Sequence, residues 1–247
     1  MTTPILSVKG LSKHFDGLKA VDNLSFDVFK GEILGVIGPN GSGKTTTFNC
    51  ITGYYKSTAG EVLFDGKPIT GRTPDFVAQQ GIGRTFQVTR PFGDMTVWEN
   101  VTTGAFLRTM HLMEAKKIAE QEVEFVGLAD KINVVARSLS IIDQRRLEFA
   151  RALATKPKLL LLDEVMAGLN AQEVDEALKL VHRVSAMGIT LVVVEHVMKV
   201  ITSISNRVLV LNFGAKLTEG KPADVMSTPS VIEAYLGKGF GDYVANC

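Results

Sequence analysis

The sequence predicts an α/β fold built around a mainly parallel sheet. Short runs rich in Val, Ile and Leu alternate with longer stretches of helical periodicity, which is typical of strands joined by helices. The central runs are apolar at almost every position, as expected for strands that are covered on both faces. The expected strands are residues 5–9, 24–28, 33–37, 62–64, 159–162, 191–194 and 208–211.

The first part of the chain has a different pattern. Residues 5–30 and 60–70 alternate more between apolar and polar side chains and are interrupted by glycines such as Gly17 and Gly66. Alternation indicates a sheet with one covered and one solvated face, and the glycines indicate turns. We expect antiparallel strands here.

A glycine-rich loop follows the expected strand at residues 33–37. Residues 38–45 have the sequence Gly-Pro-Asn-Gly-Ser-Gly-Lys-Thr, which matches the P-loop pattern, and residues 45–51 are expected to form a helix. The N–H groups of such a loop and the helix N-terminus favour phosphate. Lys44 would then reach the β and γ phosphates, and the Thr45 hydroxyl would bind Mg²⁺. We expect the chain to bind a nucleoside triphosphate.

Two adjacent carboxylates, Asp163 and Glu164, follow the expected strand at residues 159–162. They lie at the edge of a parallel sheet where ligands bind in open α/β folds. In P-loop NTPases an aspartate in this position holds Mg²⁺. Glu164 is expected to polarise the attacking water as a general base.

Between residues 88 and 154 strand-like runs give way to helical patterns, for example at residues 96–107, 114–126 and 144–154. This change predicts a helical lobe inserted before the strand that ends in Asp163.

Taken together, these motifs and their order resemble the ATP-binding cassette (ABC) ATPases over nearly the whole chain. The resemblance implies a single domain over residues 1–247, with a RecA-like P-loop core and antiparallel β part (1–87 and 155–247) and a helical subdomain (88–154). It implies that ATP and Mg²⁺ are the ligands. Gln87 matches the Q-loop glutamine, His196 matches the switch histidine that contacts the γ-phosphate, and residues 167–170 match the D-loop.

The resemblance assigns roles residue by residue. The residues expected to act in catalysis are Glu164, His196 and Gln87. The residues expected to contact the nucleotide are Phe15, which would stack on adenine, and Gly38, Pro39, Asn40, Gly41, Ser42, Gly43, Lys44, Thr45 and Thr46. The residues expected to hold the metal are Thr45, Gln87 and Asp163. For Phe15, a place in the hydrophobic core is an alternative to stacking on adenine, and the sequence favours the two equally.

One motif departs from the ABC pattern. The signature of the family is Leu-Ser-Gly-Gly-Gln, whereas residues 139–143 are Leu-Ser-Ile-Ile-Asp. Ile141 and Ile142 are β-branched and resist unusual backbone angles, and Asp143 adds a negative charge near a phosphate site. Ser140 can still cap the following helix with Asp143 in its first turn. We expect the helix to begin here but the signature to clamp a γ-phosphate poorly.

ABC sites are shared head to tail between two subunits. The loop and acids of this chain would therefore be completed by a partner's signature, and the altered signature would serve the partner's nucleotide. This implies a heterodimer with one strong and one weak site. A smaller departure is Val165, which replaces a usual proline.

Residues 81–101 and 229–237 are similar to the ATPase subunits of branched-chain amino-acid importers. This implies a second ATPase, integral-membrane permeases, an indirectly linked periplasmic solute-binding protein, and a peripheral location on the cytoplasmic side of the inner membrane. The segment after Gln87 would receive the permease, with Phe92 or Trp98 in the contact; the alternative for Trp98 is a core position. The solute stays open, because related systems carry amides, urea or aromatic acids.

Two other functions stay open as well. One is a soluble ABC ATPase that moves no solute, and the other is a nucleotide-binding regulatory subunit that hydrolyses nothing. The altered signature favours the second, whereas Glu164 and His196 oppose it.

Composition limits the partners and the location. A formal net charge of +1 gives no electrostatic basis for binding nucleic acid. The longest apolar runs are far shorter than the roughly 20 residues that span a bilayer, and residues 1–4 lack the start of a signal peptide. Cys50 is expected to be a buried hydrophobe, and with Cys247 it suggests no disulfide framework, so a reducing cytosol is the expected compartment.

Overall fold

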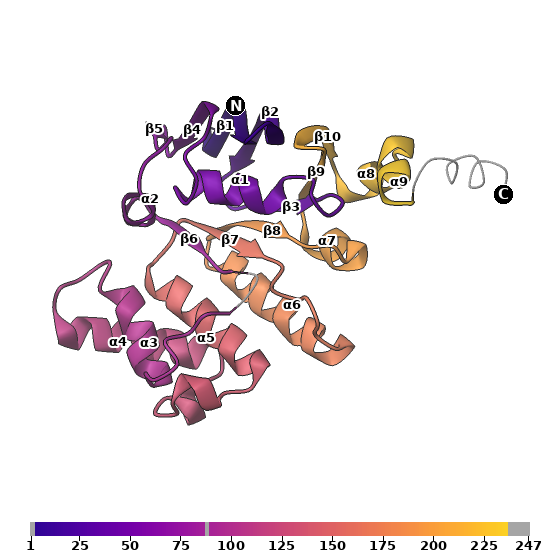
Figure 1. Ribbon diagram of the computed structural model, residues 1–247. Coiled ribbons are helices and arrows are strands. Elements are labelled where there is room, and N and C mark those ends of the chain that lie inside the picture. The colour runs from indigo at the N-terminus through magenta and orange to yellow at the C-terminus, as the bar shows by residue number, and fades with distance from the viewer. Residues whose placement is uncertain (1–2, 87–88, 237–247) are drawn as a thin grey trace. The chain divides into compact units, whose positions relative to one another are not determined.

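The computed structural model describes residues 3–86 and 89–236 and divides the chain into two compact units (Figure 1). The first unit is made of residues 1–74 and 190–247, and the second of residues 75–189. Each unit is described by itself. Among the described residues, no helix is both long enough and apolar enough to cross a membrane.

The first unit contains an antiparallel sheet with the strand order β2-β1-β4-β5. In β2 the side chains of Leu24, Phe26 and Val28 are buried while Ser25 between them is exposed. This alternation confirms the antiparallel part that the sequence predicts. The strands are β1 (Pro4–Phe15), β2 (Leu18–Phe29), β4 (Ala59–Phe64) and β5 (Lys67–Pro68).

A second group of strands in the first unit has the order β10-β9-β3-β8. β3 (Ile33–Ile37) is parallel to both β8 (Thr190–Val194) and β9 (Arg207–Asn212), and β10 (Ala215–Gly220) is antiparallel to β9. Every residue of β3 and β8 is buried, as the continuous apolar runs predict. The helices of this unit are α1 (Lys44–Ile51), α7 (Met198–Ile204), α8 (Pro222–Met226) and α9 (Pro229–Leu236).

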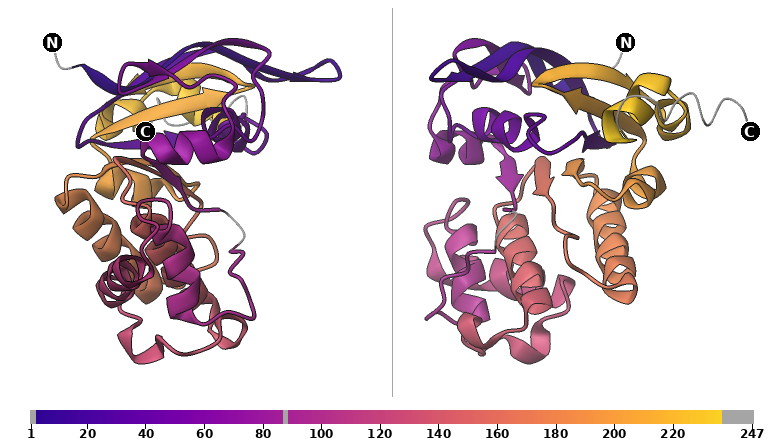
Figure 2. Two further views of the ribbon diagram at one scale, coloured as in Figure 1. Left: turned by 90° about the vertical axis from the view of Figure 1, so that its left-hand side faces the viewer. Right: turned by 45° about the vertical axis from the view of Figure 1, so that its right-hand side comes forward.

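The second unit contains the helices that the change of pattern predicts. α3 (Val97–Ala105) packs against α4 (Leu112–Phe125) and α5 (Ile141–Ala154), and both views of Figure 2 show the three side by side. Gly104 permits the close approach of α3 to α5, because a Cβ there would lie 2.4 Å from the Arg151 carbonyl oxygen.

The same unit contains two parallel strands, β6 (Ile82–Arg84) and β7 (Leu159–Asp163). β7 is buried along its whole length and ends in the first of the two acids. The remaining elements are α2 (Pro74–Gln80), α6 (Ala171–Ala186) and two short 3-10 helices at Ala129–Lys131 and Ala136–Ser138. All of the strands expected from the sequence are present, which confirms the α/β class with a parallel core.

Candidate functional site

The glycine-rich loop joins the end of β3 to the start of α1. α1 begins at Lys44, with Gly43 as its N-cap residue, and no side chain caps the helix. Its first backbone N–H groups are therefore not consumed by a capping oxygen. An uncapped helix start carries partial positive charge and attracts anions such as phosphate.

The backbone of neighbouring strands presses closely on two glycines of this loop. Gly38 has a φ of +155°, and a Cβ there would lie 2.2 Å from the Leu211 carbonyl oxygen. Gly43 has a φ of +99°, and a Cβ there would lie 2.5 Å from the Ala20 carbonyl oxygen. Backbone atoms cannot move aside as the end of a side chain can. Glycine is therefore required at both positions, as the loop pattern predicts.

The Lys44 ammonium lies inside the loop rather than in solvent. Its Nζ donates to the carbonyl oxygens of Gly38 at 2.8 Å and Pro39 at 3.0 Å, and the residue is 6% exposed. Carbonyl oxygens satisfy the hydrogen-bonding capacity of the ammonium without neutralising its charge. A cation held in this way is suited to an anionic ligand.

Phe15, at the end of β1, is partly exposed and meets Tyr55 edge to face at 5.2 Å between ring centroids. The Lys13 ammonium lies 4.6 Å from the Phe15 centroid. An exposed aromatic ring can stack on a base. Sequence reasoning missed Tyr55, and the adjacent pair Tyr54-Tyr55 just after α1 is the signal that could have revealed it.

Of the other predicted residues of the first unit, Ser42 is buried, whereas Thr45, Thr46 and His196 lie at or near the surface. Thr45 is exposed in the first turn of α1, and Thr46 is half-buried. His196 follows β8 and is exposed. Cys50 is buried, as predicted, and burial raises the pKa of its thiol to about 11, although the charge of Lys13 acts to lower it. Cys247 lies outside the described residues.

The acid pair belongs to the second unit. Asp163 is 1% exposed, and its Oδ2 accepts a hydrogen bond from Nη2 of Arg84 at 2.9 Å. Its Oδ1 is buried and has no hydrogen-bond partner among the described residues. Glu164 is also buried and has a φ of +52°, a conformation that residues other than glycine rarely adopt. Such local strain is found most often at functional sites.

Gln87 lies outside the described residues, but the residue before it is held in place. The Phe86 N–H donates to Oε1 of Glu148, on α5, at 2.9 Å. Burial raises the pKa of Glu148 to about 7, against the opposing effects of the Phe86 hydrogen bond and the charges of Arg151, Arg145 and Arg84. Sequence reasoning missed Glu148, because an acid within a helix gives no sign of its burial.

The altered signature forms the start of α5 as predicted. Ser140 is the N-cap residue, and its Oγ accepts from the Asp143 N–H at 3.2 Å. The Ser140 hydroxyl in turn donates to the Asp143 carboxylate at 2.8 Å, and Lys131 Nζ donates to the same oxygen at 2.7 Å. Ile141 is 69% exposed. The serine hydroxyl is thus engaged by a carboxylate of its own helix.

Residues 167–170 are tied to this helix through Arg145. The Arg145 guanidinium donates to the carbonyl oxygens of Val165, at 3.0 Å, and Ala167. At the end of the segment Asn170 caps α6 and forms a capping box with Glu173. One arginine therefore links the signature helix to the loop after the acids.

A glycine-rich loop that encloses a lysine, and an acid pair after a buried strand, are each typical of proteins that hydrolyse nucleotides, and comparison with known proteins agrees. The model of the family described as ABC transporter matches residues 21–167. The chain belongs to the ABC transporter family. It is therefore an ABC transporter ATPase, which implies that it binds ATP.

Two curated relatives are similar over nearly the whole chain. The high-affinity branched-chain amino acid transport ATP-binding protein BraF of Pseudomonas aeruginosa is 40% identical, over 96% of this chain and 100% of its own length. The protein LivG of Escherichia coli, with the same description, is 41% identical with the same coverage.

Solved structures of ABC cassettes have the same fold. The ATP-binding cassette MJ1267 has a TM-score of 0.87 at 33% identity, over 95% of this chain and 99% of its own. The cassette MJ0796, solved as a dimer bound to ADP and phosphate, has a TM-score of 0.80 at 27% identity, over 88% and 98% of the two chains.

Proposed function

We propose that this ABC ATPase is the ATP-hydrolysing subunit of an importer for branched-chain amino acids or related amides. The observation that carries this proposal is the identity of 40% and 41% to BraF and LivG across their entire lengths. It acts on the cytoplasmic side of the inner membrane with a second ATPase, two permeases and a periplasmic solute-binding protein.

The first step is binding of the triphosphate. The backbone N–H groups of residues 40–45, which include the start of α1, surround the phosphates, and the Lys44 ammonium exchanges its carbonyl partners for the β and γ phosphate oxygens. Phe15 stacks on the adenine. The uncapped helix start and the enclosed Lys44 support these roles.

Hydrolysis needs a group that activates water and a means of stabilising the charge on the γ-phosphoryl group while its bond to the leaving ADP breaks. Glu164 polarises the attacking water, His196 contacts the γ-phosphate, and Gln87 contacts the water or metal. Mg²⁺, held by Thr45, Gln87 and Asp163, would supply positive charge beside the phosphate oxygens. Among the described residues no three His, Cys, Asp or Glu side chains cluster, which fits Mg²⁺ because this ion is usually held by one or two protein ligands plus phosphates.

The buried Oδ1 of Asp163, unpartnered among the described residues, also fits a metal ligand. Arg84 holds the other oxygen of this carboxylate and keeps the side chain in place without occupying both oxygens. Arg84 therefore orients Asp163.

Contact with a permease is proposed for the segment after Gln87. Phe92 there is 49% exposed and Trp98 is half-buried beneath the ammonium of Lys116, 4.6 Å from a ring centroid. Of the two, Phe92 has the greater exposed surface for a partner. A conformational change that ATP binding causes at the nucleotide site would be transmitted to the permease through this segment.

The signature is proposed to be a weak clamp. To reach a γ-phosphate on a partner subunit, the Ser140 hydroxyl must leave the Asp143 carboxylate, and the phosphate must approach that negative charge. Lys131 reduces the repulsion, since it lies 2.7 Å from the carboxylate. The result is a heterodimer in which this chain supplies the catalytic residues of the strong site.

The proposal is tested by titrating ATP into the unmodified chain and into Lys44→Ala in a calorimeter. We expect the Kd to rise at least about tenfold in the variant, because one charged contact is lost. Equal affinities would overturn the nucleotide-binding role.

A second experiment, purification from the native membrane, tests the transport role. Co-purifying permeases support transport, and their absence favours an ABC ATPase that moves no solute.

A further inference from the structure

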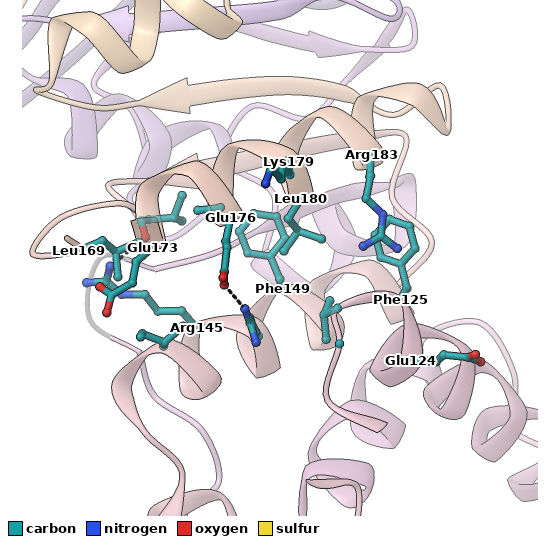
Figure 3. A pocket seen from close by; sticks show the side chains of 16 residues that line it. Glu124, Phe125, Arg145, Phe149, Leu169, Glu173, Glu176, Lys179, Leu180 and Arg183 are labelled. Atoms are coloured by element: carbon teal, nitrogen blue, oxygen red, sulfur yellow. Dashed lines mark hydrogen bonds and ion pairs between the residues drawn. The ribbon is translucent and has the colours of Figure 1, made fainter. Parts of the chain in front are cut away.

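A cavity of about 340 Å³ lies within the second unit, between the end of α4, the first half of α5, the segment at residues 165–169, and α6 (Figure 3). Its size is at the lower end of the range for small-molecule sites, about 300–1,000 Å³. None of the roles proposed above uses this cavity.

The walls of the cavity are mainly apolar. Phe125, Ile142, Phe149, Val165, Leu169 and Leu180 all line it. Ile142 and Val165 are two of the positions at which this chain departs from the ABC pattern, and they come from segments far apart in sequence. A glycine at position 142 would contribute no side chain, so the departure adds an apolar wall to the cavity.

The acidic side chains around the cavity are already paired or point away from it, so they do not balance all of its basic side chains. Arg146 pairs with Glu176 at 2.5 Å, and Glu173 is engaged in the capping box of α6. The carboxylate of Glu124 points away from the side chains around Phe149 (Figure 3).

At the Phe125 end of the cavity, Arg183 is left without an acidic partner in the described part of the chain. The Arg183 guanidinium lies over the Phe125 ring, 4.3 Å from its centroid (Figure 3), and Lys179 lies on the same helix. A guanidinium on an aromatic face keeps its edge donors available. This end of the cavity is therefore suited to an anionic group.

We propose that this cavity is a regulatory site for a small apolar carboxylate. The hydrocarbon part packs against Ile142, Phe149 and Leu180, and the carboxylate pairs with Arg183. The ligand is a molecule with one charged end and an aliphatic or aromatic body, since the apolar walls would leave further polar groups unpaired.

Such a ligand would act on the two segments that face it. Ile142 belongs to the signature helix and Val165 to the segment after the acids, and Arg145 already joins these segments through two carbonyl oxygens. A ligand packed between them would hold them in one arrangement. Its effect on ATP turnover rests on the function proposed above, whereas its binding does not.

The binding test uses octanoate as the probe, titrated calorimetrically into the full chain without nucleotide. Octanamide, which has the same chain and no charge, is the matched ligand. Ala177→Phe places a ring in the cavity, because Ala177 lines it, and Ala186→Phe makes the same change at an exposed position of the same helix that does not line it. Arg183→Gln removes the proposed anion partner from the surface.

We expect saturable binding of one octanoate per chain, weakened about tenfold or more by Ala177→Phe and unchanged by Ala186→Phe. Arg183→Gln should weaken octanoate severalfold and leave the weaker binding of octanamide unchanged. Absence of saturable octanoate binding, or equal binding by Ala177→Phe and Ala186→Phe, overturns the site. Equal binding of octanoate and octanamide to the unmodified chain overturns the role of the charge.

The regulatory role is tested separately in the purified transporter complex. Octanoate should change ATP turnover by at least about twofold in the unmodified complex and not in the Ala177→Phe complex. Binding without such a change overturns the regulatory role. ATP affinity measured on the same preparations shows whether a negative result comes from the nucleotide site instead.

Discussion

Two carboxylates on α5 differ in ionisation because their surroundings differ. Burial dominates at Glu148 and raises its pKa to about 7. At Asp143 burial also acts to raise the pKa, but hydrogen bonds from Lys131 and Ser140, together with the charges of Lys131 and Arg146, outweigh it and lower the pKa. Glu148 is thus poised to change charge near neutral pH, whereas Asp143 stays ionised.

Glu148→Gln is expected to stabilise the protein at high pH and not at low pH. A carboxyl whose pKa is raised by folding binds its proton more tightly in the folded chain, so its contribution to stability falls as pH rises from the unfolded pKa to about 7. At about 1.4 kcal/mol per pKa unit, a rise from 4.5 to about 7 limits the gain from removing this penalty to roughly 3.5 kcal/mol. Thermal unfolding of the unmodified chain and of Glu148→Gln at about pH 5 and about pH 8 measures the difference in stability. If this difference does not grow with pH, the raised pKa of Glu148 is contradicted.

Asp143→Asn is expected to have the opposite pH dependence. A carboxyl whose pKa is lowered by folding stabilises the protein above its unfolded pKa, and this stability is lost as pH falls through the folded pKa. The variant should be less stable at neutral pH, since Lys131 loses its charged acceptor. Chemical denaturation at neutral and acid pH measures the free energies of unfolding of the unmodified chain and of Asp143→Asn, and these two values should converge in acid. Asp94→Asn, at an exposed position, is the control.

Single residues were predictable where a local motif identifies them. Lys44, Gly38 and Gly43 follow from the spacing of one loop, and Ser140 follows from its place before a helix. The pairing of Asp163 with Arg84 did not follow, because the two residues are 79 positions apart and nothing in either segment indicates the other. Gln87 and the catalytic roles stay predictions.

At the scale of elements, α9 lies beside the phosphate-binding loop. Ser230, Glu233 and Ala234 of α9 line a hollow of about 730 Å³ together with residues 39–42 of the loop and part of the β9–β10 hairpin. Burial raises the pKa of Tyr235 to about 12, against the opposing effect of the Gly38 backbone amide. The end of the described chain therefore supports the outer side of the loop.

Tyr235→Ala is expected to lower the free energy of unfolding by about 2 kcal/mol, because removing a partly buried ring leaves a cavity. Tyr235→Phe should change stability by less than about 1 kcal/mol, since the buried hydroxyl makes no hydrogen bond of ordinary geometry with the described residues. Urea unfolding of both variants measures this. If the phenylalanine variant loses as much as the alanine variant, the hydroxyl rather than the ring provides the support.

Elements were predictable where periodicity is long or burial is continuous. The seven expected strands and the helices near residues 96–107, 114–126 and 144–154 are all present. Most ends shift by three residues or fewer, but β1 (Pro4–Phe15) and β2 (Leu18–Phe29) extend well beyond the expected 5–9 and 24–28. The strands β6 and β10 were missed, and β5 lies in the range 60–70 where antiparallel strands were expected without being given bounds of its own. The three residues of β6 are too few to establish a period, and the six residues of β10 contain no apolar run. α6 was also missed, although Asn170 and Glu173 form a capping-box signal that could have revealed it.

At the scale of the whole molecule, the residues predicted to act on the nucleotide come from both units. Lys44 and His196 belong to the first unit, whereas Asp163, Glu164 and the signature at residues 139–143 belong to the second. In the head-to-tail dimer proposed above, the residues assigned to catalysis in one subunit would meet the signature of the other. Under the proposal, the altered signature of this chain would therefore affect the nucleotide bound by the partner and not the one bound by its own loop.

This separation predicts unequal effects of one substitution in the two subunits. Glu164→Gln in this chain should lower ATP turnover of the assembled complex by at least about tenfold, because it removes the base of the strong site. The matching change in the partner should leave most of the turnover, and equal losses would contradict the asymmetry.

A repaired signature, with Ile141→Gly, Ile142→Gly and Asp143→Gln, is then combined with Glu164→Gln in this chain. Turnover should recover in part, because the partner's site regains a clamp that can hold its γ-phosphate.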